Sequence, residues 1–567
     1  MKKSKFSLFL GLILVLSLFL SACYGGKSQT EGKPAGGDSK GSTSEETAKP
    51  SEPQELKMLT TSETPTMDSV LGQDQASFTI LNNTNEGLYR LDKDQNAIPG
   101  VADGKSENKD NKEFTVKLKK DAKWSNGDPI TAHDFVYSWQ RQLDPAVASP
   151  YGPYMMIGKV KNANEVYTKK VKPDQLGIVA VDDYTLKITF DKPIPYFEKL
   201  MSFPSFFPQN QKYVEKEGKN FAKDDKNILY NGPYKLTNWE GPADTEWNLE
   251  KNPSYWGAKD VKLDKVDFTV QKDGQAAANA FDAGEADVTG KLATPQVISQ
   301  YEGSPELSRY LEPSVWWIKM NEKNPALKNK NIRKAIAMAV DKKSLVDDVL
   351  QNGSIPADFI VPKEWKGGMT PDGKDFQNGA KYLETNKAEA AKLWAQGLKE
   401  IGKSSLTFTY VGQDTASAKV TDAFIKDQLQ KTLPGLKLKV VGVPFKIRLD
   451  REDKQDYDLL LSGWGPDYDD PMTWLDLWIT DGGQNHMSYS NPEYDKLIQS
   501  ADKDPDTANR FKTLQAAEKL ALDGDAALAP MYQRALNVLQ KTYVKGLVHH
   551  DLGGEYSFQW TTIEGKK

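Results

Sequence analysis

Strands and amphipathic helices alternate through the second half of this chain, and this alternation constrains the fold more than any other feature. From about Glu312 onward, short apolar and β-branched runs predict strands at 315–320, 406–411, 436–441 and 459–461. Periodic apolar positions between them predict helices at 331–339, 342–350, 387–401, 416–433, 494–501 and 507–522, before a last apolar run at 527–539. Strands that alternate with helices predict an α/β fold.

The first half contains strands and helices in a less regular order. Strands are predicted at 55–59, 113–119, 184–190 and 266–270, and helices at 75–85 and 274–283. Phe135, Trp139 and Leu143 share one face of a further helix, whose start carries Thr131 and Asp134 as an N-cap pair. A length of 567 residues is enough for two or three domains.

The stretch 458–478, DLLLSGWGPDYDDPMTWLDLW, combines a strand end, an indole and several carboxylates. Gly463 and Gly465 flank Trp464, and glycine lets a backbone turn sharply or lie close against another group. The carboxylates that follow Pro466 are Asp467, Asp469 and Asp470. A carboxylate beside an indole, over bare backbone, suits a cationic group on a small ligand.

The same stretch has a purely structural interpretation. Pro471 favours a helix start, and this helix would include Trp474 and Trp478. Asp469 or Asp470 would then act as the N-cap of a strand-to-helix turn. The stretch alone leaves both interpretations open.

The N-terminus carries an export signal. Lys2, Lys3 and Lys5 precede an apolar run from Phe6 to Leu20, which is too short for a comfortable transmembrane helix. Small residues then lead to Cys23, as in a bacterial lipobox, which implies cleavage after residue 22 and lipidation of the Cys23 thiol. Since Cys23 is the only cysteine, we expect neither a disulfide nor thiol chemistry.

Residues 23–54 are expected to form a lipidated cysteine and a disordered tether, because this segment has almost no large apolar residue. The pattern G-x-S-x-G occurs there at 37–41, but a serine nucleophile needs a strand before the motif and a helix after it. The net charge of −5 and the lack of a basic stripe argue against a nucleic-acid partner.

Motifs for nucleotide and metal binding also lack the context that they need. Residues 397–404 match G-x-x-x-x-G-K-[ST], but here a helix runs into Gly402 and a strand follows, the reverse of a phosphate loop. Gly402 is therefore predicted to end the helix. Asp92, Asp94 and Asn96 imitate a calcium loop, but Ala97 replaces the required glycine, so we predict a turn.

The four histidines do not form a convincing site. These are His133, His486, His549 and His550, and no H-E-x-x-H motif or Cys/His cluster accompanies them. His133 is predicted to lie on the surface, and the pair His549–His550 is expected to do so too, with metal binding as the alternative. We therefore predict no catalytic residues, no resident metal and no cofactor.

Five segments, in this order, resemble one family. They are 124–141, 231–239, 252–256, 332–345 (IRKAIAMAVDKKSL) and 464–475. Together, behind a lipobox, they resemble the peptide and nickel class (family 5) of bacterial extracellular solute-binding proteins. Within this class the chain looks most similar to Gram-positive oligopeptide-binding lipoproteins of ABC importers.

The resemblance implies a two-lobed flytrap, the type II fold of periplasmic binding proteins, with an additional inserted domain. Lobe I would be discontinuous and comprise 55–101, 222–312 and 534–567. The inserted domain II would span 102–221, and lobe III would span 313–533. The ligand would lie in the cleft between the lobes.

The resemblance also implies the roles of individual residues. Asp467, three residues after Trp464, would pair with the α-ammonium of a peptide. The backbone at Gly463, Trp464 and Gly465 would pair with the peptide as with an added strand. The segment that would pair from the other side is Glu86, Gly87 and Leu88, and further cleft residues would be Asn485 and Tyr489.

The chain departs from some relatives at two positions. Gly465 stands where some carry a cysteine, and Leu461 stands where some carry an arginine that receives the peptide carboxylate. The candidates to take over that role are Arg448 and Arg451, and the preferred peptide length stays open.

The function implied is capture of short peptides outside the cell and their delivery to two permease subunits driven by separate ATPases. The protein would be a monomer, lipid-anchored at the outer face of a Gram-positive cell membrane. Alternatives are a nickel chelate or sugar as ligand, a peptide-pheromone sensor, or a lipoprotein that binds another protein. A hydrolase lacks a credible nucleophile, base or metal set.

Overall fold

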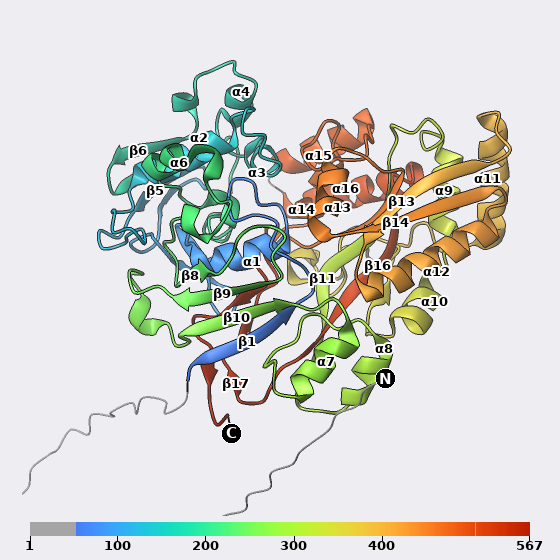
Figure 1. The fold of residues 1–567 in the computed structure, drawn as a ribbon. Coiled ribbons are helices and arrows are strands. Elements are labelled where there is room, and N and C mark those ends of the chain that lie inside the picture. The colour runs from blue at the N-terminus through green and yellow to red at the C-terminus, as the bar shows by residue number, and fades with distance from the viewer. Residues whose placement is uncertain (1–52, 195, 505, 567) are drawn as a thin grey trace, which may run out of the picture. The chain divides into compact units, whose positions relative to one another are not determined.

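The computed structural model describes residues 53–194, 196–504 and 506–566. The predicted signal peptide, Cys23, the tether and the 37–41 motif lie outside these residues. Among the helices of the described residues, none has both the length and the apolar character needed to cross a membrane. The described chain forms three main sheets (Figure 1).

The largest sheet has six strands and belongs to the second half of the chain. Its order is β12 (Ile355–Pro356), β16 (Leu528–Leu539), β11 (Leu307–Met320), β15 (Leu459–Trp464), β13 (Leu406–Gln413) and β14 (Leu436–Val443). β13 pairs in parallel with both β14 and β15, whereas β11 runs antiparallel to β15 and β16. The predicted α/β character is confirmed.

Helices cover this sheet as the apolar periodicity predicts (Figure 1). They are α9 (Lys330–Ala339), α10 (Lys342–Ser344), α11 (Lys387–Glu400), α12 (Ala416–Thr432), α13 (Phe445–Asp453), α14 (Met472–Leu475), α15 (Pro492–Lys503) and α16 (Thr507–Lys519). Asp341 caps α10 by accepting a hydrogen bond from the Ser344 amide. The predicted helix at 342–350 differs in form, because 345–350 is a π-helical turn.

Gly402 ends α11, and this confirms that 397–404 is not a phosphate loop. Its φ of 65° is left-handed, the Lys403 amide donates to the Leu398 carbonyl at 2.9 Å, and the Gly402 amide donates to Lys399. These bonds satisfy the last carbonyls of the helix. Strand β13 follows four residues later, so no helix N-terminus faces this glycine.

The second sheet has the order β1 (Glu55–Thr60), β10 (Lys265–Val270), β9 (Glu246–Lys251) and β8 (Tyr234–Thr237). β1 and β10 are parallel, and the other pairs are antiparallel. α1 (Gln75–Thr84) has Asp74 as its N-cap, whose carboxylate accepts a hydrogen bond from the Ser77 amide at 2.8 Å. Two more helices accompany this sheet, α7 (Gly274–Asp282) and α8 (Pro295–Ile298).

The third sheet lies in sequence between β1 and β8 of the second sheet. Its order is β4 (Glu107–Lys109), β5 (Glu113–Lys117), β7 (Thr185–Thr189) and β6 (Ile178–Asp182). α2 (Ala132–Gln142) buries Phe135 and Trp139 completely, as its apolar face predicts. The other helices here are α3 (Gly152–Met156), α4 (Ala163–Tyr167), α5 (Phe197–Leu200) and α6 (Gln211–Glu217). The predicted turn at Asp92 joins β2 (Tyr89–Leu91) to β3 (Ala97–Pro99), and the Asp92 carboxylate accepts from two amides of the turn.

The long strands β11 and β16 connect the first and second sheets. Beyond the end of β16, Gln540 bridges to Val288, which in turn bridges to Met58 of β1. The pairing of β11 with β16 is irregular between Leu311 and Val315. The predicted domain limits at 312/313 and 533/534 fall in this strand pair, and the limits themselves stay a prediction. The C-terminal segment adds the pairs β17 (Val544–Lys545) with β20 (Thr562–Ile563) and β18 (Val548–His549) with β19 (Tyr556–Ser557).

Candidate ligand-binding site

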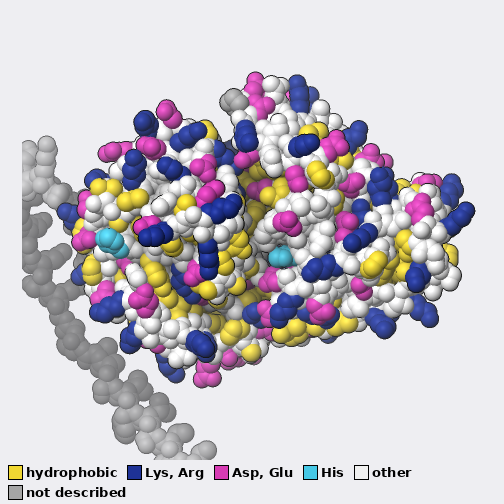
Figure 2. All heavy atoms as spheres, turned by 90° about the horizontal axis from the view of Figure 1, so that it is seen from above, with side chains coloured by type: hydrophobic (Ala, Val, Ile, Leu, Met, Phe, Trp, Pro, Cys, Tyr) yellow, Lys and Arg dark blue, Asp and Glu magenta, His cyan; other side chains and the backbone are white. Residues whose placement is uncertain are grey.

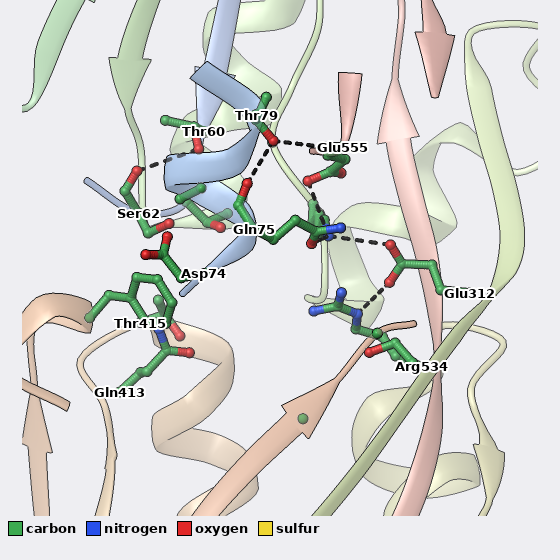
Figure 3. Close-up of a pocket in the computed structure, with 18 of the residues that line it drawn as sticks. Thr60, Ser62, Asp74, Gln75, Thr79, Glu312, Gln413, Thr415, Arg534 and Glu555 are labelled. Atoms are coloured by element: carbon green, nitrogen blue, oxygen red, sulfur yellow. Dashed lines mark hydrogen bonds and ion pairs between the residues drawn. The ribbon is translucent and has the colours of Figure 1, made fainter. Parts of the chain in front are cut away.

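One cavity, called the main cavity below, has a volume of about 390 Å³ and is lined by segments from several parts of the chain. β15 and the turn after it form one wall. The start of α1 and residues 60–62 and 64 form another, and Figure 3 shows Thr60, Ser62 and Asp74 there. Residues of α7, α12 and α13, of the 290–294 and 549–556 segments, and of β11 and β16 also line it. Figure 2 shows a groove on the surface between two masses, with hydrophobic side chains in it.

The edge of β15 opens toward this cavity. β13 pairs with β15 only at Tyr410–Leu459 and Val411–Leu460, whereas β13 keeps its pairing with β14 as far as Gln413. Beyond Leu460 the two parallel strands separate, and residues 461–465 line the cavity. Ligands of open α/β sheets bind outside the carboxyl ends of strands, which is the position of this cavity.

The two glycines of this edge have different surroundings. A Cβ added to Gly463 would lie 2.5 Å from the ring of Trp316, its partner on β11. At Gly465 an added Cβ would meet only a carbonyl oxygen at 4.0 Å. Gly463 is therefore required for packing, whereas Gly465 leaves open space beside the backbone.

Asp467 lies at the end of this edge and is 6% exposed. The Tyr151 hydroxyl donates to its Oδ1 at 2.5 Å and the Tyr154 hydroxyl donates to its Oδ2 at 3.2 Å. The same two tyrosines contact Trp464, Tyr151 stacked at 6.0 Å and Tyr154 edge-on at 6.1 Å. An aromatic cage thus holds one carboxylate beside an indole, as the 458–478 pattern predicts.

No cation neutralises Asp467 directly within the described residues. Burial raises the pKa of Asp467 to about 7, and the hydrogen bonds from Tyr151 and Tyr154 oppose this rise only in part. Asp476 raises the pKa further, and Lys159 pairs with Asp476 at 3.6 Å. A buried carboxyl with a raised pKa gains free energy from a cationic partner.

The other carboxylates of this turn are structural. Arg510 holds Asp470 in a bidentate pair at 2.7 Å, and Lys199 pairs with Asp469 at 2.7 Å. Asp470 also accepts from the Met472 amide at 2.9 Å at the start of α14. The N-cap of α14 is Pro471, so the prediction of Asp469 or Asp470 at that position was wrong by one or two residues. The two interpretations of the stretch apply to different carboxylates, since Asp470 accepts from an amide of the first helical turn and Asp467 faces the cavity.

A second charged group lies at the irregular part of β11 and β16. Arg534 pairs with Glu312, and Lys291 lies 3.3 Å from Glu312 and 3.2 Å from Glu555 (Figure 3). Glu312, His549 and Glu555 offer ligand atoms within 4.8 Å of one another. Lys291 and Arg534 already balance the charges of both carboxylates, although His549 Nε2 and Glu555 Oε1 have no hydrogen-bond partner within the described residues.

The remaining histidines are placed by their contacts. His133 is exposed on α2, as predicted, 3.4 Å from Asp183. His550 was expected at the surface but is buried, because it packs between Gln95 and Ser557, and burial lowers its pKa to about 3. His549 is also mostly buried and lines the cavity, so the expectation for this pair was wrong.

Five predicted cleft residues lie away from the main cavity. Glu86 is buried in an ion pair with Arg90 and, with Asp467, lines a smaller cavity. Gly87 and Leu88 line neither cavity, and their carbonyls accept from residues 100–102. Asn485 donates to backbone carbonyls of its own loop, and Tyr489 donates to Asp525. Ligand contacts by these five residues stay a prediction.

The sequence did not reveal other residues that line the site. Tyr151 and Tyr154 lie more than three hundred residues before Asp467 in the chain. They belong to no sequence motif that indicates a binding site. Gln73 and Asp74 at the start of α1 also face the main cavity. Only the N-cap pattern of Asp74 was a usable signal, and it predicts a helix start rather than a binding site.

The chain is similar to several known proteins. Residues 96–486 match the model for bacterial extracellular solute-binding proteins, family 5 Middle. The dipeptide-binding protein DppE of Bacillus subtilis (strain 168) is 33% identical over 561 residues, 98% of each chain. The Listeria monocytogenes OppA bound to peptide is 40% identical with a TM-score of 0.87, over 91% of this chain and all of that one. The substrate-binding domain of an oligopeptide ABC transporter from Bacillus anthracis is 39% identical with a TM-score of 0.87, over 90% and 99%.

Proposed function

Because this chain belongs to family 5 of the bacterial extracellular solute-binding proteins, we propose that it captures short peptides and delivers them to an ABC-type import permease. The fold is the two-lobed α/β fold with an additional domain, and the protein is a binding protein rather than an enzyme. Its relatives include a dipeptide-binding protein and an OppA solved with a bound peptide.

The observation that carries the proposal is the buried carboxylate of Asp467. Its raised pKa, caused first by burial, means that the hydrogen bonds of Tyr151 and Tyr154 and the charge of Lys159 compensate the carboxylate only in part. The α-ammonium of a peptide supplies that charge together with three hydrogen-bond donors. A sugar or another ligand without an amine would leave the carboxylate uncompensated, so this observation favours a peptide.

The open edge of β15 supports the same ligand. An extended peptide can add a strand at residues 461–465, where β13 has separated from β15. Main-chain hydrogen bonds of this kind give affinity without reading side chains. Gly465 leaves room for a backbone to approach, so the peptide would run along this edge with its amino end at Asp467.

A lipid anchor at Cys23 is also part of the proposal. Cys23 lies outside the described residues, and its lipobox-like context supports lipidation, which would hold the protein at the outer face of the membrane. Substitution Cys23→Ser should release the protein into the culture medium and abolish palmitate labelling. Membrane retention of the variant would argue against this anchor.

Calorimetric titration tests the ligand. The protein from residue 24 onward would be unfolded and refolded to remove carried-over ligand, then titrated with a pool of tri- to hexapeptides and with the same pool N-acetylated. We expect binding of the free-amine pool only. Asp467→Ala should weaken it by two orders of magnitude or more, since removing one partner of a buried charge pair costs about 3–5 kcal/mol.

Asp469→Asn is the matched control, because Asp469 lies two residues away but pairs with Lys199 instead of facing the cavity. It should bind peptides like the wild type. Equal affinity of wild type and Asp467→Ala would overturn the role of Asp467. If a folded wild type binds neither pool, the ligand is not a peptide, and nickel chelates are the next candidates.

A further inference from the structure

We propose that Arg448 receives the C-terminal carboxylate of a bound peptide of about three to five residues. This inference rests on the proposed function, because it assigns the second end of the same ligand. Leu461 cannot bind the C-terminal carboxylate of a peptide. If the cavity selects peptides by length, a cationic side chain elsewhere in the cavity has to compensate the charge of that carboxylate. The sequence left Arg448 and Arg451 as equal candidates.

Arg448 lies on α13 and lines the main cavity, although it is only 7% exposed. Its Nη1 donates to Glu452 Oε2 at 2.8 Å and to Ser462 Oγ at 3.4 Å. Its Nε and Nη2 make no hydrogen bond to any other described residue. A planar guanidinium can bind a carboxylate through two parallel bonds, and these unused donors give Arg448 that capacity.

The charge around Arg448 also favours an anion. Lys319 pairs with Glu452 Oε1 at 2.6 Å, so two buried cations share one carboxylate. Burial opposes ionisation of Glu452, but the charges of Lys319 and Arg448 overcome it and lower the pKa to about 2. This contact group therefore carries one positive charge in excess. A buried charge without a partner is costly, and a peptide carboxylate would compensate it.

Neighbouring carboxyl groups do not cancel this excess through an ion pair. Asp453 accepts from Gln73 at 2.8 Å and faces His486 at 3.6 Å. Asp74 feels the charge of Arg448, but burial raises its pKa to about 6 and its hydrogen bonds go to Ser77.

The other cations of the cavity wall are already balanced. Lys272 faces both Glu63 and Asp414. Lys291 and Arg534 balance Glu312 and Glu555, as described above. Arg451 does not line the cavity and pairs with Asp456 at 2.9 Å. Arg448 is thus the arginine whose surroundings favour an additional anion.

The distance along β15 gives the ligand length. The Arg448 guanidinium lies at Ser462, five positions before Asp467. At about 3.3 Å per residue, the distance along the backbone from Ser462 to Asp467 is at most about 17 Å. The distance from Ser462 to Gly465, three residues on, is about 10 Å. An extended peptide also advances about 3.3–3.6 Å per residue, so three to five residues span the two charged ends.

The test compares peptides that end in a carboxylate with the same peptides that end in an amide. Wild type should bind tri- to pentapeptide acids at least about 30-fold more tightly than the amides, because a buried charge pair is lost with the amide. Arg448→Gln should reduce this ratio to near one. Arg451→Gln, on the same helix but away from the cavity, is the matched control and should keep the wild-type ratio.

Three results would overturn the inference: a wild type that binds acids and amides equally, an Arg448→Gln variant that keeps the ratio, or loss of the ratio in Arg534→Gln instead. If Arg448→Gln fails to fold, a wild-type length series decides, because the acid-to-amide ratio should peak at three to five residues and a flat series contradicts the assignment. If wild type binds no peptide at all, the proposed function itself has failed, which is a distinguishable outcome.

Discussion

The substitution Asp467→Asn should stabilise the ligand-free protein, although it removes the proposed anchor of the ligand. Asparagine has the same shape, and its carbonyl can still accept the hydrogen bond that the Tyr151 hydroxyl donates to Asp467. It cannot ionise, so the variant avoids the burial of a charge. The stability difference should therefore depend on pH.

The magnitude follows from the pKa. Burial raises the pKa of Asp467 from its ordinary 3.8 to about 7, and each tenfold change in proton affinity corresponds to about 1.36 kcal/mol. Between these values the folded state holds a proton that the unfolded chain has released, so the free energy of unfolding falls as pH rises, by about 4 kcal/mol in total. The loss is complete above pH 7 and absent below about pH 3.8.

Compared with wild type, Asp467→Asn should thus gain about 1.6 kcal/mol at pH 5 and about 4 kcal/mol at pH 8. For a body of roughly 500 residues, the larger gain corresponds to a rise in Tm of about 4 °C. Differential scanning calorimetry of protein refolded without ligand measures this, since a carried-over peptide would stabilise wild type alone. A gain that is equal at both pH values, or a less stable variant, would refute the reasoning.

Further predictions concern the affinity for peptides. Below pH 7 the affinity should fall about tenfold per pH unit, because the ammonium must displace the proton on Asp467; titration calorimetry between pH 5 and pH 8 checks this, and a flat profile contradicts it. Tyr151→Phe removes a hydrogen bond that lowers the pKa of Asp467, so the same profile should move to higher pH, and an unmoved profile would show that this bond does not tune the site. Gly463→Ala should destabilise the protein by about 1–3 kcal/mol through its clash with Trp316, whereas Gly465→Ala should leave stability unchanged in a denaturant titration and weaken peptide binding. Equal stability of the two variants would contradict the packing of Gly463 against Trp316. Wild-type binding by Gly465→Ala would exclude a ligand backbone at this edge.

Much of the fold could be predicted from local sequence. The helices α11 and α12 and the strands β13 and β14 lie within one or two residues of their predicted limits. Apolar spacing determines which face of a helix is buried, and this spacing is a property of consecutive residues. The rejection of a phosphate loop at Gly402 likewise needed only the order of helix and strand. Local pattern missed the π-helical turns after α10 and α16, and it also missed whole elements such as β6, β9 and α13.

The sequence by itself also determined which stretch carries the site, because indole, glycines and carboxylates cluster between residues 458 and 478. It did not determine which carboxylate faces the cavity. Only the tertiary structure decided that Asp470 pairs with Arg510 while Asp467 meets Tyr151 and Tyr154. The physical reason is that a pKa and a free charge depend on burial and on partners far away in the chain, which no local pattern encodes.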